Sequence, residues 1–363
     1  MISYEKFGLK EVINASGRMT ILGVSKVSKN VLEAQRFGGE HFFEMSDLMI
    51  QTGKYLAELL QTEDAQIVSS ASAGIAQSVA AMIGRGDLYH VYHPYTSKIT
   101  KREIIIPKGH NVDYGTPVEV MIQQGGGKVV EAGYANMCST EHLERMITPE
   151  TAAILYIKSH HTVQKSMLSV AEAAKMAEKH ELPLIVDAAA EEDLFKYMQA
   201  GADLVIYSGA KAIEGPSAGL VIGKSQYVEW TRLQGKGIGR AMKIGKDNIL
   251  GFTQAVADYL SDGSESGEEL KQRLVPFVSA VNQITNLESK VVQDGAGRDI
   301  YRASVKVTGK KSALAVINEL KEENPAIYTR EYQANNGIVE FDVRSVNEQE
   351  LEKIVQRLQE IMG

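Results

Sequence analysis

The sequence has few of the features that mark secreted, membrane or nucleic-acid-binding proteins. Only one of its 363 residues is a cysteine, Cys138, which excludes an intrachain disulfide framework and favours a free, inert thiol in a reducing compartment. No run of about 18 apolar residues occurs, and the N-terminal segment MISYEKFGLK lacks the apolar stretch of a signal peptide. We therefore expect a cytoplasmic protein without a membrane partner.

Positive charge is also scarce. The chain has 39 Lys and Arg against 46 Asp and Glu, for a formal net charge of −7. A protein with this balance is not expected to bind nucleic acid or an acidic membrane surface, although a local basic patch remains compatible with it.

Short apolar runs recur along the first two thirds of the chain. Stretches of helical length and composition, such as residues 73–84 and 169–180, separate several of them. Alternating strands and helices predict a mostly parallel, doubly wound α/β sheet. The last two runs lie close together, which predicts a hairpin-like step or an antiparallel edge strand. Seven runs are bounded by turn residues and predict the strands of this sheet: 65–70, 102–107, 127–133, 152–158, 182–188, 202–208 and 218–223.

The composition changes after about residue 245. A long helical pattern is followed by the polar, acidic stretch SDGSESGEEL, which is typical of a linker. Beyond it, two expected strands and two amphipathic helices predict a small α+β domain. The predicted organisation is an N-terminal arm (1–20), a large domain (21–245), a linking helix (246–265) and a small C-terminal domain (266–363).

Three features follow predicted strands and carry the chemistry. Asp187 ends one strand, Lys211 follows the next, and the small-residue turn SSASAG (69–74) leads from a strand into a helix. Ligands of open α/β sheets bind beyond the carboxyl ends of the strands, so these features are expected at one edge. An amine for a Schiff base, a carboxylate for a protonated ring nitrogen and a helix N-terminus for a phosphate are the parts that pyridoxal phosphate requires.

Each of these parts also has an ordinary structural explanation. A lysine after a strand is commonly a solvated loop residue, an aspartate there is commonly a helix cap, and a serine-rich turn can simply cap its helix. Their order and their spacing favour the combined interpretation over the separate ones. The motif HVYH (90–93) lacks the further ligands that a metal would need, so no metal site is predicted.

Several segments resemble a known enzyme family. IVDAAAEEDL (185–194) followed by YSGAKAIEGPSAGLVIG (207–223) resembles the fold-type-I pyridoxal-phosphate enzymes, in the branch around bacterial L-seryl-tRNA(Sec) selenium transferase. Within that branch, EVINASGRMTILG (11–23), PKGHNVDYG (107–115) and GGGKVVEAGY (125–134) are similar to the D-glucosaminate-6-phosphate ammonia-lyases.

The resemblance implies roles for individual residues. Lys211 would form the Schiff base with pyridoxal phosphate and act as the base for the substrate's α-proton, and Asp187 would pair with the pyridine nitrogen. His110 would stack on the cofactor ring, and His160 or His161 would approach the phenolic oxygen. The cofactor phosphate would be held by Ala71, Ser72 and Ala73, with Ser208 as a hydroxyl donor.

The implied reaction is loss of water and then of ammonia from a phosphorylated amino sugar acid, which gives a 2-keto-3-deoxy sugar acid 6-phosphate. Such a substrate requires additional cations, and enzymes of this fold usually act as homodimers or larger even assemblies. Alternatives are a selenium transferase acting on seryl-tRNA, another pyridoxal-phosphate lyase or aldolase, and a non-catalytic regulatory protein that binds the cofactor. The candidate cations for the substrate are Arg18, the cluster of Lys98, Lys101 and Arg102, and Arg240, Lys243 and Arg344.

Overall fold

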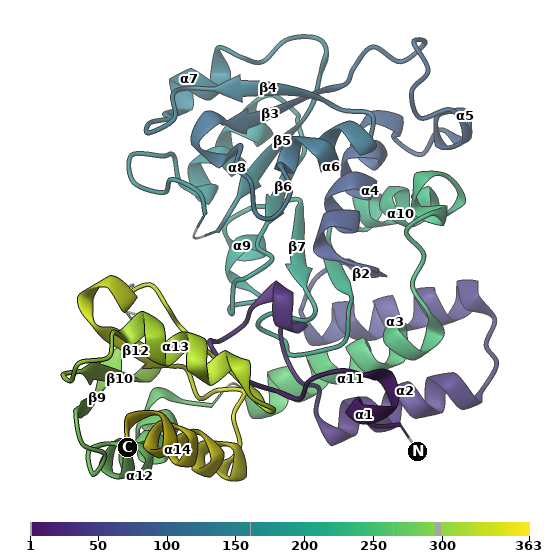
Figure 1. The fold of residues 1–363 in the computed structure, drawn as a ribbon. Helices are drawn as coiled ribbons and strands as arrows, with labels where there is room; N and C mark the ends of the chain where they lie inside the picture. The colour runs from purple at the N-terminus through teal and green to yellow at the C-terminus, as the bar shows by residue number, and fades with distance from the viewer. Residues whose placement is uncertain (1, 160, 264, 295–298) are drawn as a thin grey trace. The chain divides into compact units, whose positions relative to one another are not determined.

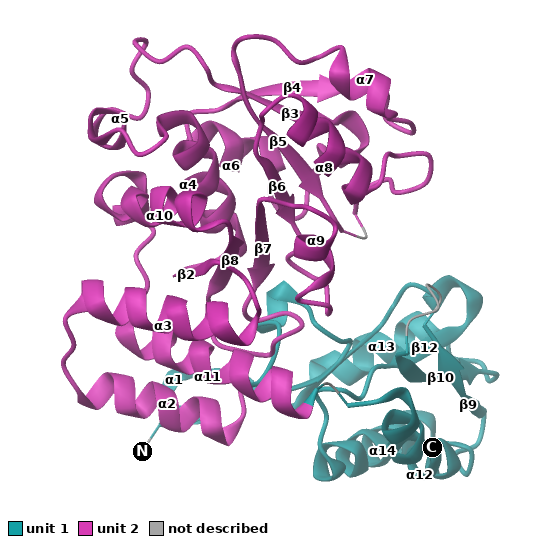
Figure 2. Cartoon of the chain, turned by 180° about the vertical axis from the view of Figure 1, so that it is seen from behind, with its two compact units in different colours: residues 1–26, 263–363 teal, residues 27–262 magenta. Residues whose placement is uncertain are grey.

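The computed structural model describes residues 2–159, 161–263, 265–294 and 299–363. The chain forms two compact units, a large one of Val27–Asp262 and a small one that combines Met1–Lys26 with Gly263–Gly363 (Figure 2). These boundaries differ from the expected ones in two places. The N-terminal segment is counted with the small unit, and the expected linking helix, observed over Lys246–Asp262, is counted with the large unit.

The large unit is built on one seven-stranded sheet, and all seven expected strands belong to it (Figure 1). The strand order is β2-β8-β7-β6-β5-β3-β4. Four neighbouring pairs are parallel, whereas β8 runs antiparallel to both β7 and β2. The mostly parallel α/β fold and the hairpin-like step from β7 to β8 are thus confirmed. The alternative of an antiparallel edge strand is wrong, because β2 lies outside β8. The strands are β2 (Asp64–Val68), β3 (Glu103–Pro107), β4 (Lys128–Ala132), β5 (Thr151–Ile157), β6 (Leu184–Asp187), β7 (Leu204–Ser208) and β8 (Gly219–Gly223).

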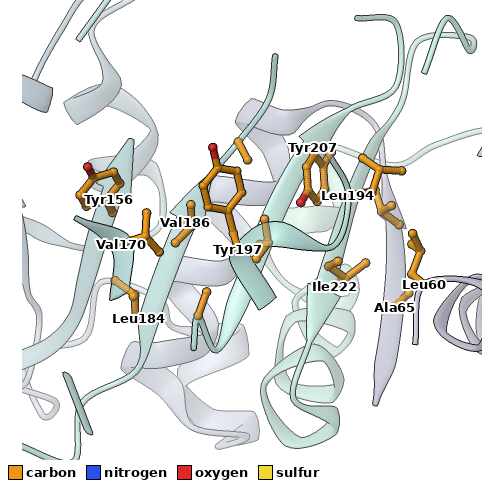
Figure 3. Close-up of a cluster of buried hydrophobic side chains, with 14 of the residues drawn as sticks. Leu60, Ala65, Tyr156, Val170, Leu184, Val186, Leu194, Tyr197, Tyr207 and Ile222 are labelled. Atoms are coloured by element: carbon orange, nitrogen blue, oxygen red, sulfur yellow. The ribbon is translucent and has the colours of Figure 1, made fainter. Parts of the chain in front are cut away.

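Both faces of this sheet are buried, which explains why its strands are apolar throughout rather than alternating. Alternate residues serve opposite faces: in β5, Ile154 and Tyr156 belong to one apolar cluster and Ala153 and Leu155 to the other. Figure 3 shows part of the first cluster, to which Tyr197 contributes. Helices α3 (Met45–Leu59), α8 (Val170–Lys179) and α11 (Lys246–Asp262) supply apolar side chains to the first cluster, and α4 (Ala71–Gly84), α6 (Val118–Gln124) and α10 (Ser225–Leu233) to the second.

Local sequence signals set the ends of these helices. Ser169 and Glu172 form a reciprocal capping box at the start of α8, and Ser70 caps α4 by accepting a hydrogen bond from the Ala73 N–H. None of the described helices is long and apolar enough to cross a membrane. The remaining helices of the large unit are α2 (Lys29–Glu40), α5 (Leu88–Tyr92), α7 (Thr140–Glu144) and α9 (Lys196–Gln199).

The small unit joins the two ends of the chain. Strand β1 (Val12–Ala15) pairs in parallel with β11 (Ala326–Thr329), more than 300 residues later, and its Ile13 and Ala15 are buried in the core of this unit. A second, antiparallel sheet has the order β12-β10-β9. Its strands and the helices of the unit are β9 (Leu287–Gln293), β10 (Tyr301–Val307), β12 (Ile338–Phe341), α1 (Tyr4–Phe7), α12 (Gly267–Val281), α13 (Ala313–Glu322) and α14 (Glu348–Met362).

Candidate active site

The sheet topology brings the predicted functional segments to one edge. Strands β2, β5, β6 and β7 all run in the same direction, because β8 reverses between β2 and β7. Their carboxyl ends therefore face the same side. Asp187 is the last residue of β6, Ser208 is the last residue of β7, and α4 begins directly after β2.

Asp187 is a buried carboxylate in the field of a lysine. Its side chain accepts a hydrogen bond from the Ala189 N–H at 3.1 Å, and the residue is 7% exposed. Burial raises the pKa of Asp187 to about 6, and the positive charge of Lys211 opposes that rise. A carboxyl group in this setting is stabilised in its charged form by a cationic partner such as a protonated pyridine nitrogen.

Lys211 lies in a tight turn that immediately follows β7. Its N–H approaches the Ser208 carbonyl oxygen at 3.4 Å, and the Gly215 N–H donates to the Gly209 carbonyl at 2.8 Å, which closes the loop. The lysine itself is half-buried. The charge of Lys211 thus acts on the buried carboxylate of Asp187.

The first turn of α4 supplies the backbone N–H groups of Ala71 and Ser72, which lie in the part of a helix that has no intrahelical acceptors. Gly219, the first residue of β8, approaches this turn so closely that a Cβ there would lie 2.5 Å from the Ser70 carbonyl carbon. The backbone is therefore packed around the helix N-terminus with no space for a side chain. Sequence reasoning did not identify Gly219, although a glycine that opens a buried strand is a signal of such an approach.

Tyr114 is a second residue that sequence reasoning missed. Its hydroxyl oxygen lies 3.3 Å from Ser72 Oγ. Burial raises its pKa, the hydrogen bond to Ser72 lowers it, and the charge of Asp187 raises it further. Tyr114 therefore contacts the helix N-terminus and lies within electrostatic range of the carboxylate.

His110 does not have the environment expected of a ring that stacks on a cofactor. It is fully buried, its Nε2 donates to the Val163 carbonyl at 3.1 Å, and its Nδ1 lies 3.4 Å from the Ile157 N–H. One ring edge packs against Tyr156, and burial lowers its pKa to about 4. The stacking role predicted for His110 is corrected to a structural one, because neither ring face is exposed to a ligand.

Arg102 is likewise not available for a substrate. Its guanidinium group donates to the backbone carbonyls of Pro94, Thr96, Ile99 and Gly126, at distances from 2.6 to 3.0 Å. These bonds bind together the segment before β3 and the turn before β4. The prediction that Arg102 binds substrate is wrong, and its role is structural.

The other predicted cations have different environments. Arg344 forms a two-bond ion pair with the fully buried Asp342, which also pairs with Arg302. Arg18 is half-buried in the small unit. Arg240 and Lys243 are exposed and line a pocket of about 840 Å³ within the large unit.

The two histidines that follow β5 are His160 and His161. His161 is exposed on the loop that follows this strand, whereas His160 lies outside the described residues. Within the described ranges, no cluster of three or more His, Cys, Asp or Glu side chains that could hold a metal ion is found.

These residues fit pyridoxal phosphate. The site offers a half-buried primary amine, a buried carboxylate and a helix N-terminus packed so closely that only glycine is accommodated beside it. On a doubly wound, mostly parallel sheet, this combination defines a pyridoxal-phosphate enzyme of fold type I.

Comparison with known proteins identifies the family. The profile of the L-seryl-tRNA selenium transferase family, SelA, matches residues 46–316. The chain is 43% identical to the D-glucosaminate-6-phosphate ammonia lyase of Salmonella typhimurium, over 99% of this chain and 97% of that one. It is 34% identical to a 5'-C-glycyluridine monooxygenase-decarboxylase of Streptomyces, over 99% and 92%. A solved structure of a D-glucosaminate-6-phosphate ammonia-lyase superimposes with a TM-score of 0.94 at 43% identity, covering 99% of this chain and 97% of that one. The chain belongs to the selenium transferase family of pyridoxal-phosphate enzymes.

Proposed function

We propose that this protein is a D-glucosaminate-6-phosphate ammonia-lyase. The observation that carries the proposal is similarity over nearly the whole chain, both in sequence and in structure, to an enzyme of that name. It is supported by the position of Asp187 and Lys211 at the edge where this fold binds its ligands.

The proposed reaction removes the proton from C2 of the substrate and the hydroxyl group from C3, which leaves as water. Water then replaces the nitrogen at C2, so that ammonia leaves and 2-keto-3-deoxygluconate 6-phosphate is formed. When bound, pyridoxal phosphate supplies a sink for the electrons left at C2.

The chain's own residues have separate tasks in this scheme. Lys211 provides the amine that attaches the cofactor and, once the substrate amine has replaced it, the base for the C2 proton. Asp187 keeps a proton on the pyridine nitrogen, since a buried carboxylate is stabilised by that charge. Ala71 and Ser72 hold the cofactor phosphate at the start of α4, with Ser208 as a further hydroxyl donor and Tyr114 as a support for Ser72. The third predicted residue, Ala73, already donates its N–H to Ser70 Oγ, so it is not assigned to the phosphate.

Substrate binding is proposed for Arg18, Arg240, Lys243 and Arg344. Guanidinium and ammonium groups match the carboxylate and the phosphate of the amino sugar acid. His161 is proposed as the acid that assists departure of the C3 hydroxyl group, on the basis of its exposed position beyond β5.

A homo-oligomer is also proposed, and the cytoplasmic location expected from the sequence stays a prediction. Support for self-association comes from large apolar side chains exposed on α2, on α3 and between them, of which Phe42 is 99% exposed and Phe37 50%. Light scattering of the wild type and of Phe42→Asp would measure the assembly. A wild-type monomer would contradict this part of the proposal.

The activity is tested by incubating the cofactor-loaded protein with D-glucosaminate 6-phosphate and measuring ammonia and keto acid together. Lys211→Ala is the matched control, and borohydride treatment followed by peptide mass analysis checks that the cofactor is attached at Lys211. Equal yields of ammonia and keto acid, absent in the variant, are expected. Cofactor attached at Lys211 without turnover of this substrate would reject the proposed activity, and seryl-tRNA would then be tested as the alternative substrate.

A further inference from the structure

The small unit contains a pocket of about 440 Å³, formed entirely by its own residues. Strands β1 and β11 are parallel neighbours, with Ala15 opposite Thr329. The chain leaves both strands in the same direction, and the residues that follow them line the pocket: Ser16, Met19 and Ile21 after β1, and Arg330, Glu331 and Tyr332 after β11. The parallel pairing therefore builds the pocket from the two ends of the chain.

Two hydrogen-bond donors in the residues of this pocket have no acceptor in the part of the chain that the structure describes. Thr329 is 3% exposed, and its buried Oγ1 has no hydrogen-bond partner among the described residues. The same holds for the buried Nε of Arg330. Leaving a buried polar group unpaired is destabilising, and more so for a charged group. Thr329 and Arg330 are adjacent and both line this pocket, and their unpaired donors point to an acceptor that the protein itself does not supply.

The charge of Arg330 is poorly compensated. Its nearest carboxylate oxygen, Glu340 Oε2, is 3.8 Å away from Nε, which is too long for a hydrogen bond. Burial lowers the pKa of Arg330, and the neighbouring Arg302 lowers it further, whereas Asp342 and Glu340 act in the opposite direction. Arg302 is itself paired with two carboxylates.

The other two charged residues of the pocket, Lys321 and Glu331, form an ion pair with each other, so together they add no net charge. The pocket therefore has one partly buried positive charge and a spare hydroxyl group. Tyr332, whose ring lies 5.1 Å from the guanidinium carbon, adds an aromatic wall, as does Tyr328.

We propose that this pocket binds the phosphate group of a small polar molecule, with the Arg330 guanidinium and the Thr329 hydroxyl as donors. Phosphate oxygens accept several hydrogen bonds in the fork geometry that a guanidinium offers. The pocket is large enough for the rest of a small ligand as well. The inference rests on the small unit alone and does not depend on the proposed activity.

Calorimetric titration of the cofactor-loaded protein with inorganic phosphate tests this site without turnover. Binding to the wild type is expected, with at least a tenfold loss of affinity in Arg330→Gln and a loss of about fivefold to tenfold in Thr329→Val, which keeps the side-chain volume. Arg357→Gln is the matched control, since Arg357 is an arginine of the same unit that does not line the pocket. It is expected to bind phosphate like the wild type.

If Arg330→Gln fails to fold, the phosphate affinity of Thr329→Val tests the proposal. Absence of phosphate binding to the wild type, or wild-type affinity in Thr329→Val, would overturn the proposal. Gluconate is titrated in parallel because it offers a carboxylate in place of a phosphate, and tighter binding of gluconate would also overturn it.

Discussion

The hydroxyl oxygens of Ser72 and Tyr114 lie 3.3 Å apart, which connects the first turn of α4 to the loop that follows β3. This contact joins the segment proposed to hold the cofactor phosphate to a loop some forty residues further along the chain. The position of the loop therefore affects how well the helix N-terminus is ordered for a ligand.

Removing the phenolic hydroxyl tests that relationship. Tyr114→Phe is expected to weaken pyridoxal-phosphate binding by about twofold to tenfold, which corresponds to the loss of one hydrogen bond of roughly 0.5–1.5 kcal/mol. Cofactor affinity would be measured by absorbance titration. Tyr95→Phe is the control, because the Tyr95 hydroxyl bonds to the Gln124 carbonyl at an exposed position, and its cofactor affinity should be unchanged.

Gly219→Ala is expected to disturb the same turn from the opposite side. The new Cβ would lie within 2.7 Å of the Ser70 carbonyl group and the Ala71 nitrogen, so the backbone of the turn must move, at a cost of about 1–3 kcal/mol. Both thermal stability and cofactor affinity should fall. Gly235→Ala, where a Cβ meets nothing within 4 Å, should change neither, and equal effects in the two variants would contradict the packing argument.

Two buried groups are expected to give opposite pH dependences of stability. The folded-state pKa of Asp187 is raised from 3.8 to about 6 by burial, so its contribution makes the cofactor-free protein less stable as pH rises from about 4 to 6. The folded-state pKa of His110 is lowered from 6.5 to about 4, again by burial. Its contribution makes the protein less stable as pH falls through the same range. Each effect is on the order of 3 kcal/mol.

Asp187→Asn separates the two effects. The variant without cofactor is expected to be more stable than the wild type above pH 6 and similar to it near pH 4, which leaves a steeper loss of stability toward acid. Urea unfolding at a series of pH values would measure this, with His161→Asn as the control for an exposed group. Parallel pH profiles for Asp187→Asn and the wild type would show that the carboxylate does not titrate as described.

Cys138 is expected to be unreactive in the folded protein. It is buried, with 1% of its surface exposed, and burial raises its pKa to about 11, so the reactive thiolate is scarce at neutral pH. Because Cys138 is the only cysteine, iodoacetamide labelling followed by mass analysis reports the reactivity of this thiol alone. Labelling in urea but not in buffer is the expected result, and rapid labelling in buffer would contradict it.

Substitution of Arg102 is expected to affect stability, and substitution of Arg240 is expected to affect substrate binding. Arg102→Gln should lower stability by roughly 2–4 kcal/mol, because it leaves several backbone carbonyls without a donor. The KM of the proposed reaction should then change little. Arg240→Gln, at an exposed position, should leave stability within about 0.5 kcal/mol of the wild type and raise KM. The reverse pattern would restore the original assignment of Arg102 to substrate binding.

The seven strands of the large sheet could be predicted without the structure. Each is a short apolar run because both faces of the sheet are covered by helices, and a run of that kind is recognisable without the fold. The helix starts at Ser70 and Ser169 are also local, because each capping side chain accepts a hydrogen bond from a backbone N–H within one turn. The prediction of Lys211 and Asp187 followed from the rule that ligands bind beyond strand ends, together with the family resemblance.

Features that depend on contacts between distant segments could not be predicted from local sequence. β2 pairs with the outer side of β8, so the antiparallel strand is internal to the sheet. No local pattern specifies which strand is outermost. β1 pairs with β11 across most of the chain, which is why the N-terminal segment belongs to the small unit. The burial of His110, the contact of Tyr114 with Ser72 and the commitment of Arg102 to backbone carbonyls all depend on which loops meet. A residue's type fixes what it can bind, but only its neighbours in space fix whether its donors are already used.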